Sequence, residues 1–426
     1  MQSKKRFAAL LLSAWLASGY VEAEDLTLTD ATQKAVTENP LLNVYALRKE
    51  AIEARREVAA LRPGFELGIE VENFAGTDGL SGIDEAEITA SLSSVIELGS
   101  KRSARMALVD SRAGMLRIEL EAKALDMLGA MTSQFISALA SREQLALAQE
   151  ASTLAEKTSS VVEERTAAGV SPDAELLRAK AAELQIRTSV ENTARKLKVA
   201  MVGLGTFWGE RSQSSYVVQG DLFAFGEDKK FAEIWDLAVA SPAIKTFANE
   251  SRLREAELRL AESQNKLDIR WSLGIRRLEG LDDSALVGSL QFPLNSGRRN
   301  RGAVAAVRAE RAEVEVRREQ ALNQLYARLY DAYATRKQNI VAVDRLSKET
   351  VPALTEALEE TQSAFEAGLY SYLELIAAQR ALIDAKQTKI ATAAAALQAA
   401  VIIEQLTGIS LQSSTDVSQA LQDTFE

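Results

Sequence analysis

Residues 101–168, KRSARMALVDSRAGMLRIELEAKALDMLGAMTSQFISALASREQLALAQEASTLAEKTSSVVEERTAA, decide the fold of this chain. The stretch has no proline, its only glycines are Gly114 and Gly129, and it is rich in good helix formers. Apolar residues recur at helical spacing in two adjacent stripes, Leu116, Leu120, Ala124, Met127, Met131, Phe135, Ala138 and Met115, Ile118, Ala122, Leu125. The stretch predicts a helix of roughly 100 Å with two packing neighbours, far longer than a helix of an ordinary globular domain.

Composition narrows the possible functions. The 426-residue chain has 50 basic and 60 acidic residues and a net charge of −10, which argues against nucleic acid as a partner. It contains no cysteine and no histidine. Catalysis by a thiolate or an imidazole, metal sites built from these ligands, and disulfides are therefore excluded.

The N-terminus has the parts of a secretory signal. Lys4, Lys5 and Arg6 precede a short apolar run at 7–16, and Val21-Glu22-Ala23 resembles a small-x-small cleavage site. We expect residues 1–23 to be a cleaved signal peptide. The alternative is a membrane anchor, for which the apolar run is short. The apolar stretch 390–403 is interrupted by polar residues and is expected to pack as an ordinary helix.

Two segments that precede the long helix alternate strictly between apolar and polar residues. In 65–74 the apolar set is Phe65, Leu67, Ile69, Val71 and the polar set is Glu66, Gly68, Glu70, Glu72. In 87–97 the two sets are Ile88, Ala90, Leu92, Ser94, Ile96 and Glu87, Thr89, Ser91, Ser93. Both segments are predicted to be strands with one apolar face, joined by a loop.

The pattern occurs twice. Asn39-Pro40 matches Ser241-Pro242 and Ala168-Gly169 matches Ala367-Gly368, about 200 residues apart, and the first strand matches Leu267, Ile269, Trp271, Leu273. One duplicated unit of helix, strand, strand, long helix and helix is therefore predicted. The first copy spans 24–204, with strands 65–74 and 87–97, long helix 101–168 and helix 171–204. The second spans 231–408, with strands 267–276 and 285–294, long helix 299–367 and helix 371–407. Residues 205–230 are predicted to link the copies, and 409–426 to form a C-terminal tail.

Local signals predict how these helices begin and bend. Thr29 or Asp30 can cap the first helix, which bends or restarts at Asn39-Pro40. Ser171 is expected to cap the helix that follows Gly169, with Pro172 in its first turn. A kink is expected at Pro352.

Strands of about ten residues suit a tilted membrane strand, with lipid on the apolar face and a wet lumen on the polar face. One chain offers four strands, whereas the smallest barrels use about eight and open edges are not tolerated in lipid. Three copies would supply twelve strands and twelve helical columns. The alternative, a soluble protein with two exposed hairpins on long coiled coils, leaves four apolar strand faces unexplained.

These residues resemble the outer membrane factor family, the TolC-like exit ducts of Gram-negative efflux and secretion systems. Within it, ITASLSSVIELGSKRSAR at 88–105 looks like the CzcC branch, which serves heavy-metal resistance pumps. The turns AGVSPDAELL at 168–177 and AGLYSYLEL at 367–375 are typical of the whole family. The resemblance covers nearly the whole mature chain.

The resemblance implies a mainly α fold with a membrane β-barrel portion. It implies a homotrimer, with a twelve-stranded barrel of four strands per chain in the outer membrane and an α-helical barrel that crosses the periplasm. Residues 205–230 would be an equatorial linker. The implied partners are a periplasmic adaptor, an inner-membrane RND-type pump and outer-membrane lipid.

The resemblance also places the two helix turns at the periplasmic tip, where they would meet the adaptor and close the channel. The residues concerned are Gly169, Val170, Ser171, Pro172 and Gly368, Leu369, Tyr370, Ser371. In a trimer, Asp173, Glu175 and Glu374 would form acidic rings there, which favour cations. The alternative is that these residues only complement the starts of their helices.

Two further groups of charged residues are expected in the barrel. Glu66, Glu70, Glu72, Arg270 and Arg276 share the expected lumen, so its field is mixed. The basic residues at the periplasmic edge of the barrel are expected to snorkel to the interface, with a ligand role as the alternative; they are Lys101, Arg102, Arg298 and Arg299.

A passive duct needs no catalytic residue, so neither an enzyme nor a cofactor is expected. The function indicated is the exit duct of a tripartite pump that exports heavy-metal cations, which would pass as weakly held ions because soft ligands are absent. A TolC-like duct for drug efflux or type I protein secretion is the alternative within this fold. From a different class, a periplasmic adaptor or coiled-coil protein would have one hairpin rather than two, and an enzyme with paired carboxylates is a remote third.

Overall fold

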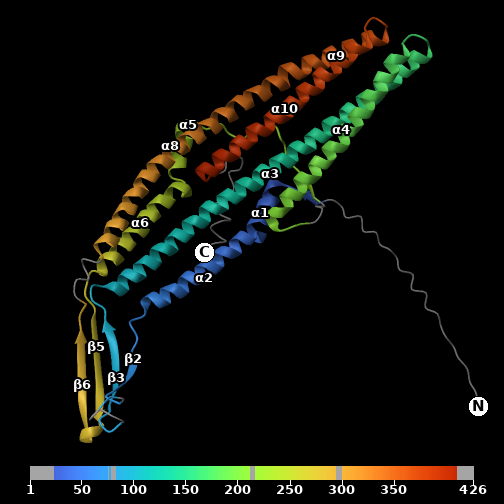
Figure 1. Ribbon diagram of the computed structural model, residues 1–426. Coiled ribbons are helices and arrows are strands. Elements are labelled where there is room, and N and C mark those ends of the chain that lie inside the picture. The colour runs from blue at the N-terminus through green and yellow to red at the C-terminus, as the bar shows by residue number, and fades with distance from the viewer. Residues whose placement is uncertain (1–23, 75, 78–82, 212–215, 294–299, 410–426) are drawn as a thin grey trace, which may run out of the picture.

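The computed structural model describes residues 24–74, 76–77, 83–211, 216–293 and 300–409. The expected signal segment 1–23, residues 410–426 of the expected tail, and Arg298 and Arg299 lie outside these residues. Figure 1 shows an elongated molecule, with strands at one end and two helix turns at the other. The expectation of a mainly helical chain with a strand portion is confirmed.

Two long helical columns organise the molecule (Figure 1). The first is α3, Lys101–Ala167, and the second is built from α8, Arg301–Arg345, a π-helical segment, Leu346–Thr350, and α9, Val351–Glu366. Near the turns, each column packs against a returning helix, α4, Asp173–Gly205, or α10, Tyr372–Thr407. Near the strands, the neighbours are α2, Pro40–Ala60, and α6, Pro242–Ser263. Helix α3 also contacts α6 and α10, so it joins the two copies.

Helix starts differ from the expected caps in two places. Thr27, rather than Thr29 or Asp30, caps α1, Leu28–Glu38, and Asp30 completes a capping box with it. Helix α4 begins at Asp173 with Pro172 at the cap position and no side-chain cap, so Pro172 lies before the first turn rather than inside it. Ser171 does not cap α4, because its hydroxyl accepts a hydrogen bond from Arg165 (3.3 Å).

The long helix of the second copy is interrupted where a kink was expected. The π-helical segment ends at Thr350, and the N–H of Val351 donates to the carbonyl of Leu346, five residues back. Pro352 has no N–H and would clash with the carbonyl four residues before it in a regular α-helix. The wider π turn directly before Pro352 relieves that conflict.

The four predicted strands form one antiparallel sheet in the order β2-β3-β5-β6. Their bounds are Glu66–Glu72, Glu87–Ile96, Ile269–Leu278 and Asp283–Gln291. The register aligns the apolar residues of all four strands, as in the row Leu67, Leu92, Leu273 and Gly288. One face therefore exposes large apolar side chains, which include Leu67, Ile69, Leu273, Ile275, Leu286 and Leu290. In the part of the chain that the structure describes, β2 and β6 each have one edge with no partner strand.

The linker between the copies has structure that the sequence did not reveal. Its strand β4, Tyr216–Val218, pairs in parallel with β1, Glu24–Leu26, and both pack on the middle of α3. Helix α5, Phe231–Val239, starts the second copy. Each column holds the linker with an arginine, because Arg142 donates to the carbonyls of Val218 and Gly220 and the buried Arg336 donates to those of Phe225 and Glu227.

Candidate functional site

The two helix turns have the same geometry. Gly169 and Gly368 both adopt a positive φ, of 75° and 78°, which is the usual way for a helix to end. The next residue of each turn donates to a carbonyl in the last helical turn, Val170 to Arg165 and Leu369 to Ala364, both at 2.8 Å. The duplicated sequence signal therefore produces two matching turns side by side at one end of the molecule (Figure 1).

The turns expose apolar side chains. Leu369 is 78% exposed and Val170 63% exposed, and Tyr370 is half exposed. Leu177 and Leu373, in the first helical turns that follow, are also exposed. A solvent-facing end of a helical hairpin has no packing reason to carry such residues, so they point to a contact with another molecule.

Arg165, at the end of α3, ties the two turns together. Its guanidinium donates to the carbonyl of Phe365 (2.7 Å), lies over the Phe365 ring at 4.6 Å and also donates to Ser171. A cation at the last carbonyls of α9 is further favoured by the helix dipole. Deeper in the hairpins, Gln379 donates to Thr158 (2.8 Å) in a buried hydrogen bond.

The three candidate acidic residues have different environments. Glu374 closes a capping box with Ser371, whose backbone N–H and hydroxyl hold the pKa of the Glu374 carboxyl below its ordinary value of 4.5. Asp173 and Glu175 lie in the first turn of α4, and Glu175 is close enough to Tyr372 for its charge to affect the pKa of the Tyr372 hydroxyl. Burial raises the pKa of the Tyr372 hydroxyl. Both Glu374 and Asp173 are exposed, but Glu374 is engaged by hydrogen bonds at its helix start.

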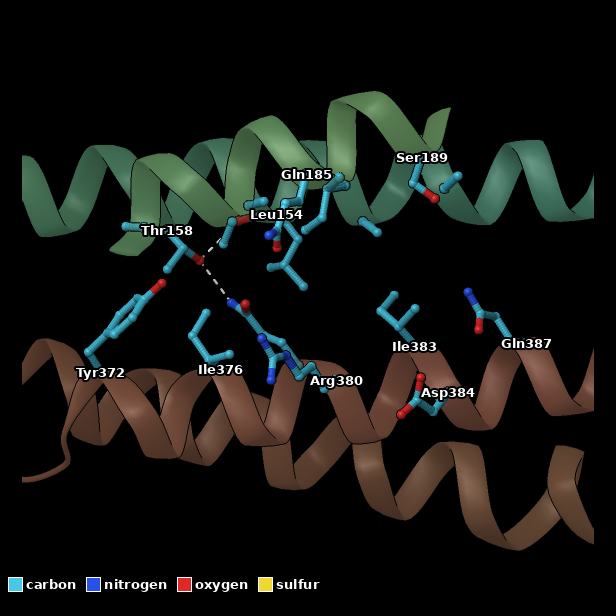
Figure 2. A pocket seen from close by; sticks show the side chains of 17 residues that line it. Leu154, Thr158, Gln185, Ser189, Tyr372, Ile376, Arg380, Ile383, Asp384 and Gln387 are labelled. Carbon is cyan, nitrogen blue, oxygen red and sulfur yellow. Dashed lines mark hydrogen bonds between the residues drawn. The ribbon is translucent and has the colours of Figure 1, made fainter. Parts of the chain in front are cut away.

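Behind the tip, a cavity of about 250 Å³ separates α4 from α10, with α3 as its floor. Figure 2 shows Gln185 and Ser189 on one side and Arg380, Asp384 and Gln387 on the other. The floor is small and apolar, with Ala148, Ala151, Leu154 and Ala155. Along α10 the cavity extends from Tyr372, in the first turn of the helix, to Gln387.

The polar face of the sheet brings together four of the five residues expected in the lumen. Arg276 bridges Glu72 (2.8 Å) and Glu87 (2.7 Å), and Arg270 approaches Glu66 (3.4 Å). The fifth, Glu70, faces Thr89 in the register, and it forms no ion pair with any described residue. Much of the negative charge on this face is therefore neutralised across strands.

At the junction of strands and helices, the basic residues expected at the barrel edge have different environments. Lys101 forms an ion pair with Asp268 (2.6 Å) and is only 11% exposed, so it is held by protein rather than extended to the interface. Arg105 forms a bidentate pair with Glu97. Arg102 is exposed. No group of three or more acidic side chains that could hold a metal ion occurs among the described residues.

By length and composition α10 could cross a membrane, but 56% of its most apolar window is buried inside the molecule. Its buried residues pack on α3 and α8, as in Ile390, Ala393, Leu397 and Val401. Burial of this kind explains an apolar helix without a membrane, as the sequence led us to expect.

Comparisons with known proteins agree with this architecture. No protein-family model matches the chain. The cobalt-zinc-cadmium resistance protein CzcC of Cupriavidus metallidurans is 26% identical over 91% of both chains. The chain is a homologue of CzcC.

The chain also resembles solved outer-membrane channels. CusC, described as forming a transmembrane channel, superposes with a TM-score of 0.75 at 15% identity, over 93% of this chain and 95% of CusC. The CmeC outer membrane channel of Campylobacter jejuni gives 0.74 at 14% identity, over 93% and 88%. The fold is thus that of TolC-like outer-membrane channels.

Sequence reasoning missed the side chains that join distant parts of the chain. Arg165, Asp268 and Arg336 each contact residues about 100 to 200 positions away, and no local pattern announces such partners. No local signal marks Arg165, because the equivalent residue of the second copy is Ala364, 199 positions later, and the two turns also differ at most neighbouring positions.

Arg165→Ala should loosen the tip. The change removes two charge-assisted contacts and a cation–π contact, and we expect the last turn of α9 to lose about 1–2 kcal/mol of local stability. Hydrogen exchange of residues 362–368 measures this. Arg178→Ala, which removes an exposed tip arginine without an ion pair, is the control and should exchange like the parent. Equal exchange in all three proteins would contradict the assigned link.

The start of α10 should respond to acid through Glu374. Because the folded pKa is lowered, the cap stabilises the helix start fully above pH 4.5 and is lost as pH falls through the folded pKa. After correction for the intrinsic pH dependence of amide exchange, the protection of residues 372–376 against hydrogen exchange should therefore fall in acid in the parent. In Glu374→Gln this protection should already be low at neutral pH and should change less with pH. An unchanged acid response in that variant would contradict the cap.

Proposed function

We propose that this chain is the outer-membrane exit duct of a tripartite efflux pump and that it passively conducts heavy-metal cations. The observation that carries the proposal is a four-stranded sheet with one exposed apolar face, placed below two long helical hairpins in a homologue of CzcC. Such a chain leads from a membrane to a distant docking end. The two hairpins argue against a periplasmic adaptor, which would have one.

The edges of the molecule support a homotrimer with a closed barrel. Strands β2 and β6 offer one unpaired edge each, and lipid tolerates no open edge. The outer helices also offer uncovered surfaces at both edges of the molecule. Exposed apolar residues gather on α2 and α4 at one edge and on α8 at the other. They are Val44, Leu47, Val58, Leu177, Leu184, Val199 and Val316, Tyr326, Tyr330, Val341. A head-to-tail ring of three copies would cover both edges and give twelve strands.

The tip supports an adaptor contact. Val170, Leu369 and Tyr370 are exposed on adjoining turns, and the cavity between α4 and α10 lies behind them, from Tyr372 onward. In a trimer, Asp173 and Glu175 would add rings of negative charge around the same opening. An adaptor that also contacts an inner-membrane RND-type pump would complete the path.

The cargo proposal rests on CzcC, whose name describes cobalt, zinc and cadmium resistance. The chain has no cysteine and no histidine, so it lacks the thiolate and imidazole ligands that hold such ions tightly. The ion pairs of Arg270 and Arg276 reduce the negative field in the barrel. Weak binding suits a duct, because an ion that is held tightly would leave slowly.

Deletion of the gene should sensitise the host to metals and leave tolerance to hydrophobic drugs unchanged. The panel is zinc, cobalt, cadmium, copper and silver, together with several hydrophobic drugs, measured beside the complemented strain. We expect the minimal inhibitory concentration of at least one metal to fall severalfold. Sensitivity to drugs alone would replace the metal assignment with a general efflux duct of the same fold.

Substitutions at two adjacent residues of β5 test which face of the sheet contacts lipid. Leu273 lies on the exposed apolar face and Ser272 on the polar face. Leu273→Lys should destabilise the membrane-inserted protein by about 2–4 kcal/mol and reduce its yield in the outer membrane, because a lipid-facing charge near the midplane is costly. Ser272→Lys, the matched control, should assemble like the parent. The reverse ranking would overturn the assignment of faces.

A further inference from the structure

The junction of strands and helices contains cations that form no ion pair with any residue that the structure describes. We define the junction as residues 61–66, 96–102, 264–270 and 300–301, where the chain passes between the two parts. All its acidic residues are engaged: Glu66 pairs with Arg270, Glu97 with Arg105 and Asp268 with Lys101. The remaining charged side chains are exposed and form no ion pair with any residue that the structure describes; they are Arg62, Lys266, Arg102 and Arg301.

We name these four residues the rim collar. The collar is a local excess of positive charge in a chain whose net charge is −10, so it runs against the overall composition. The opposite end of the sheet has the other sign, with Asp84, Glu85 and Asp283 in and beside its loops. The charge asymmetry follows the long axis of the sheet and is not a general property of the surface.

Exposed apolar residues accompany the collar along the chain. Leu61 precedes Arg62 and Leu267 follows Lys266, and both are exposed. On the apolar face at the same end of β2 and β5, Phe65 and Trp271 form an edge-to-face pair at 6.3 Å. Aromatic and aliphatic residues beside cations are typical of a membrane–water interface, where the apolar part enters the lipid and the charge reaches the headgroups.

The geometry points to a binding surface for anionic phospholipid at the rim collar. Its ligand is the phosphodiester of a headgroup with net negative charge, in the leaflet on the helical side of the membrane. The acidic residues of the junction are already paired with Lys101, Arg105 and Arg270, so they do not compete for the collar. A zwitterionic headgroup carries its own ammonium group, so it would bind the rim collar more weakly. The inference rests on the proposed function, since it requires the sheet to lie in a membrane.

Native mass spectrometry of the purified, detergent-solubilised protein tests this, with added phosphatidylglycerol as the probe and phosphatidylethanolamine as the zwitterionic comparison. The rim variant is R62Q/R102Q/K266Q/R301Q. The control variant is R112Q/K157Q/K230Q/K245Q, which removes as many exposed cations without ion pairs from the helical part. We expect the parent and the control to prefer phosphatidylglycerol, and the rim variant to bind it about tenfold more weakly.

Equal phosphatidylglycerol binding by the parent and the rim variant would overturn the proposal, as would an equal loss in the control. Displacement of the lipid by millimolar inorganic phosphate would also overturn it, because the surface would then recognise free phosphate. If the rim variant fails to fold, the four single variants and a salt series on the parent take its place. The preference should weaken as salt rises, and independence of salt would contradict the collar.

The same samples separate this inference from the proposed function. A band that shifts on heating in gel electrophoresis reports an assembled barrel without reference to bound lipid. An assembled barrel with no preference for phosphatidylglycerol overturns only the collar. Absence of an assembled barrel in the parent removes the membrane placement, and the collar fails with it.

Discussion

The open edges of one four-stranded sheet are the constraint on which the rest of this structure depends. Backbone N–H and C=O groups at a strand edge need partners, and lipid supplies none. Strands β2 and β6 leave such edges, and the face between them is apolar. A single chain cannot close a barrel with four strands, which is why we propose that several copies share one. The proposed trimer, the helical columns above it and the passage through them all follow from that requirement.

The columns show how a duplicated unit can build a continuous wall. In each copy, two shorter helices lie one after the other along one long column, so the column has a packing partner above and below its middle (Figure 1). The copies are not identical where they meet. Arg165 reaches across to the turn of the second copy, whose equivalent residue is Ala364. The linker is held from both sides by Arg142 and Arg336. Small departures from the repeat therefore fix the copies relative to each other.

Ion pairs neutralise some of the charged residues in the expected lumen and at the rim. A simple count of charged residues therefore does not describe either surface. On the polar face, Arg276 satisfies Glu72 and Glu87 together, which the sequence could not show because the three residues lie on three strands. At the junction, Asp268 forms an ion pair with Lys101, one of the cations expected to reach the membrane interface. The cations that form no ion pair with any described residue are the ones that can still bind another molecule.

The sequence alone determined the element order, the repeat, the alternation of the strands and the glycine turns. These depend on local rules: helical and strand periodicity, the preference of glycine for positive φ at helix ends, and the disruption of the long helix by Pro352, in the first turn of α9. The tertiary structure decided the rest. It set the register that aligns Leu67, Leu92 and Leu273, the parallel pairing of β1 with β4, and the partners of Lys101 and Arg165. Those contacts join residues that are distant in the chain, and a local sequence pattern carries no information about which of several compatible charges or strands will meet.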